Sequence, residues 1–187
     1  MLPAYIVYKA ENIWSTWTEG GPKGTRYNCS RSGWFDSYCF SDWFETLFVP
    51  HAKKLRGKEV LIGDNLSSHF TATVLRLTEQ HDILFVCLPP NATHLLQPLD
   101  MAFYRPVKGY WQKVLDEWKS GCKKAAQTLS KDIFPLLLTK LYTLLYPTDK
   151  QKSDNMKAGF ITCGINPPNK MAVLAKSLHQ SKIESQL

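Results

Sequence analysis

The sequence predicts an α/β fold in which two parallel strands are joined by a helix. Residues 59–62 and 83–88 are short apolar runs with the length and composition of buried strands. Between them, residues 71–81 have the spacing of an amphipathic helix. A strand, a helix and a strand at these distances are typical of a right-handed parallel crossover. The side chains expected to face inward from the helix are Val74, Leu75 and Leu77.

The elements before this crossover follow from the same kind of pattern. Residues 5–9, YIVYK, are rich in β-branched and aromatic side chains and predict a strand. Residues 19–34 carry glycines, a proline and small polar side chains, and they predict a loop. Residues 41–54 predict a helix with Ser41 as its N-cap, which Pro50 should end or kink.

Two helices are predicted after the crossover. Residues 104–118 place aromatic and aliphatic side chains on one face of a helix and polar side chains on the other. Residues 133–145 form a further helix that Pro147 ends. We expect one domain over residues 1–175, followed by a polar tail over residues 176–187.

Composition narrows the class of protein. With 187 residues the chain can bury a sizeable core, and 44% hydrophobic and 21% charged residues are ordinary for a globular protein. No apolar run approaches the roughly 20 residues that a membrane-spanning helix needs, so no membrane association is expected. The five cysteines are scattered and form no CxxC pair. This argues against a zinc knuckle and suits a reducing compartment.

The excess positive charge lies in the second part of the chain. The formal net charge is +7, yet residues 1–104 hold 9 Lys and Arg against 10 Asp and Glu. Residues 105–187 hold 14 against 6. A one-sided positive field favours polyanions such as nucleic acids. A solubilising surface is the alternative explanation of the same charge.

Two aspartates follow the predicted crossover strands at positions suited to metal chemistry. Asp64 comes at the end of the first strand, and Asp100 follows the second strand after a proline and asparagine loop. Carboxylates at the carboxyl ends of parallel strands can converge, and hard cations prefer oxygen ligands. Two such cations can stabilise the attacking and leaving oxygens at a phosphate. The alternative for each aspartate is a turn or a helix cap.

Several motifs resemble one known family. The most specific are LIGDNLSSH at residues 61–69 and LPPNATHLLQPLDMAFYRPVK at residues 88–108. SGW at residues 32–34, DWF at residues 42–44 and a GF…GINPPN block at residues 159–169 support them. Together they resemble the DDE superfamily endonuclease domain of pogo, Tigger and Jerky-type transposable elements, whose relatives include centromere protein B.

The resemblance implies an RNase H-like fold of the DDE transposase and integrase type, which is a mixed sheet with flanking helices. It also implies catalysis by three acidic residues with Mg²⁺ or Mn²⁺. Asp64 matches the second acid and Asp100 the third, so both are expected to be catalytic and to bind metal. The Gln97–Pro98 segment is expected to shape the turn that aims Asp100. His69 and His94 lie in the motif blocks, and a packed or capping role is expected for each.

One departure from the family pattern limits the expected chemistry. The family's first acid lies on its first strand, upstream of the segment that matches residues 2–9. The first one or two strands, and that acid with them, are therefore expected to be lacking. The strand over residues 59–62 should then have an unpaired edge, which predicts low stability or completion by another chain. Upstream acids that could substitute are Glu11, Glu19, Asp36 and Asp42, and none of them ends a predicted core strand.

The resulting prediction is a DNA-binding domain derived from a DDE-type transposase and catalytically incomplete. The basic residues expected to contact DNA phosphates are Arg105, Lys108, Lys113, Lys119, Lys123 and Lys124. One alternative is an active metal-dependent endonuclease or strand-transfer enzyme completed by a longer isoform or a partner chain. Another is a domesticated protein-interaction module. DNA is the expected partner and the nucleus the expected location, with a homo-oligomer as an open alternative.

Overall fold

The computed structural model describes residues 2–64, 66–121 and 128–176. Its strands form two separate parallel pairs. Strand β1 (Tyr5–Lys9) pairs with β2 (Arg26–Ser30), and β3 (Glu59–Gly63) pairs with β4 (Ile83–Cys87). The α/β class is therefore confirmed. The strands of the described ranges do not join into one mixed sheet, and the RNase H-like architecture stays a prediction.

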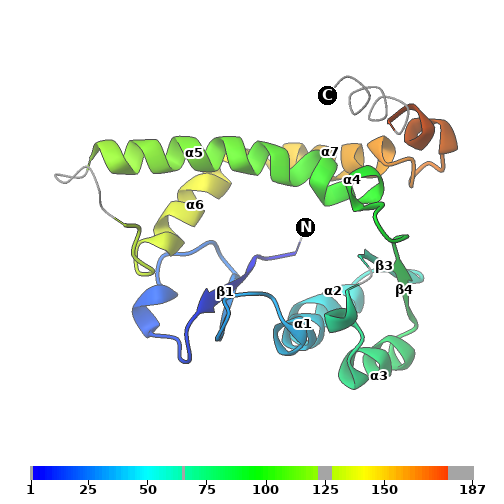
Figure 1. Ribbon diagram of the computed structural model, residues 1–187, viewed down its shortest axis with the longest axis horizontal. Coiled ribbons are helices and arrows are strands. Elements are labelled where there is room, and N and C mark those ends of the chain that lie inside the picture. Colours follow the sequence, from blue (N-terminus) through cyan, green and yellow to red (C-terminus); the bar gives the residue numbers. More distant parts are fainter. Residues whose placement is uncertain (1, 65, 122–127, 177–187) are drawn as a thin grey trace.

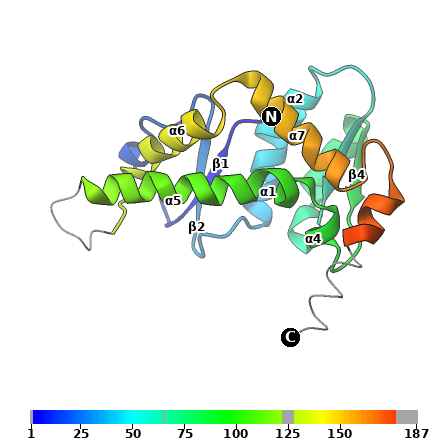
Figure 2. The same ribbon diagram turned by 90° about the horizontal axis from the view of Figure 1, so that it is seen from above.

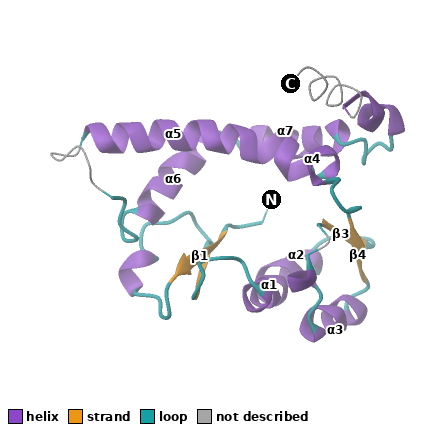
Figure 3. Ribbon diagram, viewed as in Figure 1, coloured by secondary structure: helices purple, strands orange, loops and turns teal. Residues whose placement is uncertain are grey.

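Helices form most of the remaining regular structure (Figure 3). The α-helices are α1 (Ser37–Trp43), α2 (Val49–Ala52), α3 (Ala72–Gln80), α4 (Thr93–Leu96), α5 (Arg105–Ser120), α6 (Phe134–Leu145) and α7 (Asp149–Thr162). Two 3-10 segments are η1 (Ser15–Trp17) and η3 (Ser67–His69), and two π-helical segments are η2 (Phe44–Phe48) and η4 (Asp100–Tyr104). None of the helices in the described ranges is long and apolar enough to span a membrane.

Helix α5 runs along one side of the molecule, from the end that holds β3 and β4 to the end that holds β1 and β2 (Figures 1 and 2). Two apolar cores correspond to these two ends. In the first, Phe44 and Val74 are buried where η2 and α3 pack beside the β3–β4 sheet. In the second, Val114 of α5 is buried against Leu138 of α6. Burial of these apolar side chains stabilises each end of the molecule.

The predicted parallel strand–helix–strand unit is confirmed, and its right-handedness stays a prediction. Strands β3 and β4 are parallel, and α3 lies between them in sequence. The Thr71 hydroxyl accepts a hydrogen bond from the Val74 amide at 3.2 Å and caps the start of α3. Val74 and Leu77 are buried, but the prediction that Leu75 faces inward is wrong, because this side chain is 53% exposed. The buried face of α3 is narrow, and Leu75 lies outside it.

The predicted loop over residues 19–34 is wrong in part, because β2 lies within it. Glycines and small polar residues dominate this stretch, so its composition does not indicate that residues 26–30 form a strand that pairs with β1. The pairing is a tertiary contact, since residues Tyr5–Lys9 supply the backbone partners. Local composition therefore carries no signal for β2.

The helix predicted over residues 41–54 begins earlier, at Ser37, and ends at Ala52. Its N-cap is Asp36, whose carboxylate accepts a hydrogen bond from the Cys39 amide at 2.9 Å. The N-cap role predicted for Ser41 is therefore wrong. Pro50 neither ends the helix nor follows a regular α-turn, because the π-helical segment η2 stands directly before α2. The wider turn accommodates a residue that lacks a backbone N–H.

The helices predicted over residues 104–118 and 133–145 correspond to α5 and α6. Tyr104, expected on the apolar face, lies in η4 and is 42% exposed. No pattern predicts α7, which packs against η4. The division at residue 175 stays a prediction, because residues 177–187 lie outside the described part of the chain.

Candidate metal and nucleic-acid site

The carboxyl ends of β3 and β4 point toward α4 and the start of α5 (Figure 1). Asp64 follows directly after Gly63, the last residue of β3. The Leu88 amide donates to the Gly63 carbonyl oxygen at 2.8 Å, which holds the two strand ends together. The strand pair thus fixes the backbone from which the Asp64 side chain extends. This matches the predicted placement of Asp64 at the end of a core strand.

Asp64 is paired with His69, which lies in η3 five positions further along. Its Oδ1 is 3.1 Å from His69 Nδ1. Both atoms are shielded from solvent, and neither has a hydrogen-bond partner in the described structure. His69 stacks on Phe40, with ring centroids 4.2 Å apart. The prediction of a packed histidine is confirmed at His69, and its contact with Asp64 is an additional feature. His94 lies exposed in α4.

Asp100 is the first residue of η4 and is exposed. The N-cap residue of η4 is Leu99, so the alternative role of Asp100 as a helix cap is not observed. The Gln97 carbonyl oxygen accepts hydrogen bonds from the amides of Asp100, at 3.1 Å, and Met101, at 3.4 Å. These bonds close the turn in front of Asp100, in agreement with the role expected for Gln97–Pro98.

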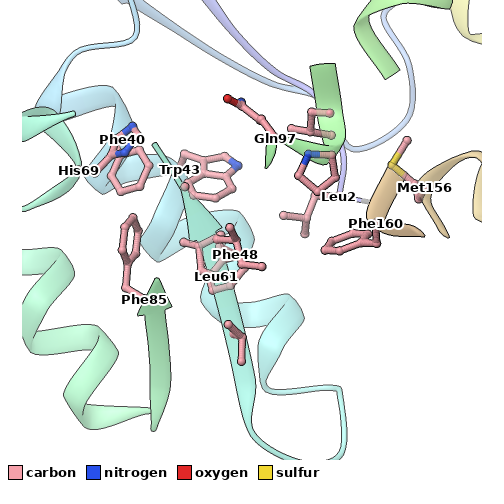
Figure 4. A pocket seen from close by; sticks show the side chains of 15 residues that line it. Leu2, Phe40, Trp43, Phe48, Leu61, His69, Phe85, Gln97, Met156 and Phe160 are labelled. Atoms are coloured by element: carbon pink, nitrogen blue, oxygen red, sulfur yellow. The ribbon is translucent and has the colours of Figure 1, made fainter. Parts of the chain in front are cut away.

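A cavity of about 410 Å³ connects the two aspartate-bearing segments. It is lined by Gly63 and His69 on one side and by Gln97, Pro98 and Leu99 on another. Figure 4 shows His69 and Gln97 among its lining side chains, with apolar rings between them. Asp64 directly follows Gly63, and Asp100 directly follows Leu99. Each aspartate therefore comes one residue after the lining of the same cavity.

A divalent cation would find carboxylate oxygens at this place, the ligand type that Mg²⁺ and Mn²⁺ prefer. Asp64 Oδ1 is shielded and has no hydrogen-bond partner among the described residues, and the Asp64 side chain as a whole is 29% exposed, so the carboxylate keeps surface that a cation could reach. Within residues 2–64, 66–121 and 128–176, no group of three or more His, Cys, Asp or Glu residues is placed to hold a metal ion. The described residues therefore form no complete metal site, and cation binding by Asp64 and Asp100 stays a prediction.

The four acidic residues upstream of Asp64 differ in their surroundings. Asp36 caps α1, and Glu11 and Glu19 are exposed. Asp42 accepts a bidentate pair of hydrogen bonds from Arg26, both at 2.8 Å. The Tyr5 hydroxyl donates to Asp42 Oδ2 at 2.6 Å. The Arg26 guanidinium, with its hydrogen bonds, holds the pKa of Asp42 below its usual value.

Arg105, Lys108 and Lys119 lie exposed on α5 at spacings that place them on one face. Asp116 interrupts this face and accepts a hydrogen bond from Gln112 at 2.8 Å. Lys113 lies to the side, with its Nζ 5.2 Å from the centre of the Tyr110 ring. Lys123 and Lys124 lie outside the described residues. Three of the expected basic residues, Arg105, Lys108 and Lys119, therefore share one exposed face of α5.

Two aspartates beside one cavity, followed by a basic helix, are typical of metal-dependent proteins that act on nucleic acids and of domains derived from them. The family model of the DDE superfamily endonuclease matches residues 1–156. The chain belongs to this family, which confirms the resemblance seen in the motifs at residues 61–69 and 88–108.

Curated relatives include transposon-derived proteins. Over 168 residues the chain is 24% identical to the Pogo transposable element with KRAB domain of Mus musculus, covering 88% of this chain and 27% of that protein. It is 28% identical over 102 residues to the Jerky protein of Mus musculus, covering 46% and 18%. It is 26% identical over 115 residues to the MFS-type transporter clz9 of Cochliobolus lunatus, covering 60% and 12%. The chain thus spans from 12% to 27% of these relatives' lengths. No solved structure matches it.

Proposed function

We propose that this chain is a nuclear DNA-binding domain that holds a divalent cation weakly through Asp64 and Asp100. The observation that carries the proposal is the exposed basic face of α5, which begins five residues after Asp100 at Arg105. Phosphates bound along this face would lie next to η4, which begins at Asp100. The relatives named as transposable elements support DNA as the polyanion.

The affinity for DNA arises from contacts between α5 and phosphates. Arg105, Lys108 and Lys119 present positive charge to solvent without an ion-pair partner among the described residues. Glu117 on the same helix is paired with Lys140 of α6, which reduces its effect on the field. Phosphate contacts of this kind are independent of base sequence and weaken with salt. Trp111 packs against Phe134 in the core, so base stacking by Trp111 is not part of the proposal.

The cation would be held by oxygens of Asp64 and Asp100. When bound, Mg²⁺ or Mn²⁺ stabilises negative charge at a phosphate and activates water. Asp64 lies on a rigid strand end, whereas Asp100 lies on a turn fixed by Gln97. Efficient catalysis requires ligands that converge with little freedom. With these two carboxylates we expect weak cation binding and little nuclease activity by the chain alone.

Fluorescence anisotropy with a labelled DNA duplex tests the proposal. The triple variant Arg105→Ala, Lys108→Ala, Lys119→Ala should bind more weakly than wild type. The slope of log affinity against log salt should fall by about 1 for each contact removed.

A matched control removes three positive charges elsewhere, by Lys53→Ala, Lys54→Ala and Arg56→Ala in the exposed segment after α2. This control should leave the salt slope close to that of wild type. An equal loss of DNA affinity in both triple variants would show that net charge, and not the face of α5, determines binding. A wild-type affinity that does not change with salt concentration would refute phosphate binding.

A second candidate is a metal-dependent DNA endonuclease completed by another polypeptide. Strand β3 pairs only with β4 among the described strands, and residues 60–63 line the cavity of about 410 Å³ along their length. A neighbouring cavity of about 680 Å³ is lined by residues 2–6, which lead into β1. Unpaired strand edges accept added strands. A strand bound here could bring a further carboxylate to Asp64. Nicking of supercoiled plasmid by the isolated chain with Mn²⁺, abolished by Asp64→Asn, would favour the endonuclease over the proposed inactive domain.

A further inference from the structure

His69 lies against Asp64, and two of their polar atoms face each other away from solvent. Its Nδ1 and Asp64 Oδ1 are 3.1 Å apart, and both are shielded from solvent without a hydrogen-bond partner among the residues that the structure describes. A buried polar atom that lacks a partner destabilises the folded protein. Two such atoms that face each other satisfy one another after a small rotation of the carboxylate. The pair is therefore placed to form one hydrogen bond from the imidazole to the carboxylate.

The ring of His69 is fixed by aromatic neighbours, whereas the carboxylate is not. Phe40 stacks on the ring at an interplanar angle of 25°, and the Phe85 centroid lies 6.2 Å away. Figure 4 shows the rings of Phe40, His69 and Phe85 together at one side of the cavity. Only 14% of the His69 side chain is exposed. Because stacking fixes the ring plane, it also fixes the direction in which Nδ1 points.

Of the two Asp64 oxygens, Oδ1 is the one recorded as shielded from solvent. The Asp64 side chain is 29% exposed, although Oδ1 is shielded. The oxygen left for an external ligand is therefore Oδ2. A carboxylate held through one oxygen by a fixed donor presents the second oxygen in one orientation. Outer partners orient metal ligands in this way, and their loss typically weakens metal affinity by about 10- to 100-fold.

We propose that His69 is a positioning residue, whose Nδ1–H donates to Asp64 Oδ1 and thereby turns Oδ2 toward a divalent cation. The inference rests on the proposed function, because it requires Asp64 to be the cation ligand. It goes beyond the motif LIGDNLSSH, which indicates only that a histidine follows Asp64. In this arrangement the aromatic core around Phe40 determines the geometry of the metal ligand.

The first test needs no metal. Nitrogen NMR of the full chain with labelled histidine reports which ring nitrogen of neutral His69 carries the hydrogen. The proposal requires the hydrogen on Nδ1. A neutral His69 with the hydrogen on Nε2 and a bare Nδ1 would overturn it, whatever the metal affinity of the chain.

The second test is a titration with Mn²⁺ followed by electron paramagnetic resonance. The variant His69→Phe keeps the stacking on Phe40 and removes both nitrogens, and it should weaken Mn²⁺ binding by about 10- to 100-fold. His69→Asn should recover most of the affinity, because its side-chain amide nitrogen can take the place of Nδ1. His81→Asn, at the end of α3, is the matched control and should bind as wild type. Thermal unfolding confirms that each variant folds.

The outcomes separate this inference from the proposed function. Binding that survives His69→Phe but is lost in Asp64→Asn would overturn the positioning role alone. Binding that is unchanged in Asp64→Asn, or absent in wild type, would overturn the proposed metal site, and the NMR result would still decide the hydrogen bond. Nitrogen coupling from His69 in the Mn²⁺ spectrum would show direct ligation and would also overturn the positioning role.

Discussion

Asp42 and Asp64 show how surroundings give two aspartates different roles. Asp42 is enclosed by Arg26, Tyr5 and Asn28, so its oxygens are occupied by donors that join β1 and β2 to α1. Among the described residues the charged partner of Asp64 is His69, and 29% of the Asp64 side chain is exposed. The first arrangement favours stability, whereas the second leaves an oxygen for a ligand. In the described structure, Asp42 is thus a structural ion-pair residue.

The variant Asp42→Asn should lower the free energy of unfolding at pH 7 by about 1 kcal/mol, because the Arg26 pair is partly exposed and screened by solvent. Arg26 lowers the pKa of Asp42 in the folded protein. The contribution is therefore complete above the unfolded pKa of about 3.9 and is lost as the pH falls through the folded value. Urea unfolding of both proteins across this range measures the difference.

The control for this prediction is Asp116→Asn on α5. Asp116 is exposed and has a neutral partner, Gln112, so its loss should change stability little. A stability difference between wild type and Asp42→Asn that persists unchanged in acid would contradict the ion-pair explanation.

The residues of the site were predictable to different degrees. Both aspartates lie in specific motifs, and Asp64 comes directly after the apolar run of β3, as predicted. Asp100 instead begins η4, and α4 lies between it and β4. The contact between His69 and Asp64 depends on how η3 turns and on the stacking with Phe40 from α1, and no sequence pattern encodes it. The network around Asp42 likewise depends on β2, whose position is set by distant partners.

At the scale of elements, α7 controls the position of the turn that bears Asp100. Gly159 of α7 is buried against this turn. A Cβ at residue 159 would lie 2.7 Å from the Pro98 carbonyl oxygen and 3.1 Å from Ala102 Cβ. Only glycine allows α7 to approach η4 so closely. Gly159 therefore sets how closely α7 packs against the turn that precedes Asp100.

The variant Gly159→Ala should destabilise the protein by about 1–3 kcal/mol, because backbone or helix must shift to admit the methyl group. It should also weaken Mn²⁺ binding by displacing Asp100. Gly109→Ala on α5 is the matched control, since nothing lies within 4 Å of its Cβ position. Here alanine should stabilise by up to about 1 kcal/mol. Equal free energies of unfolding in urea for Gly159→Ala and Gly109→Ala would refute the close contact between α7 and η4.

The elements that the sequence predicts best are those with local signals. Helix α3 has a threonine cap and apolar spacing, and β3 and β4 are compact apolar runs. Strand β2 and helix α7 escape prediction because neither has a clear apolar period of its own. Each is held by an element distant in sequence, β1 in the first case and η4 in the second.

The whole molecule consists of two ends bridged by α5. One cavity is lined by residues of β3 and β4, and a second cavity by the start of β1. This arrangement agrees with the predicted unpaired edge beside β3, since β3 has only β4 as a neighbour among the described strands. Low stability and completion by another chain both stay predictions. The sequence indicated the edge through a family resemblance, but apolar periodicity alone gives no account of which strands are neighbours.

Iron-directed cleavage of the chain tests whether Asp64 and Asp100 share one cation. Fe²⁺ replaces Mg²⁺, and peroxide with ascorbate produces radicals at the bound iron that cut nearby backbone. We expect two cuts, one close to residue 64 and one close to residue 100, and both should disappear in Asp64→Asn. A cut near one of these residues alone, or cleavage that does not depend on Asp64, would show that the two aspartates do not form one site.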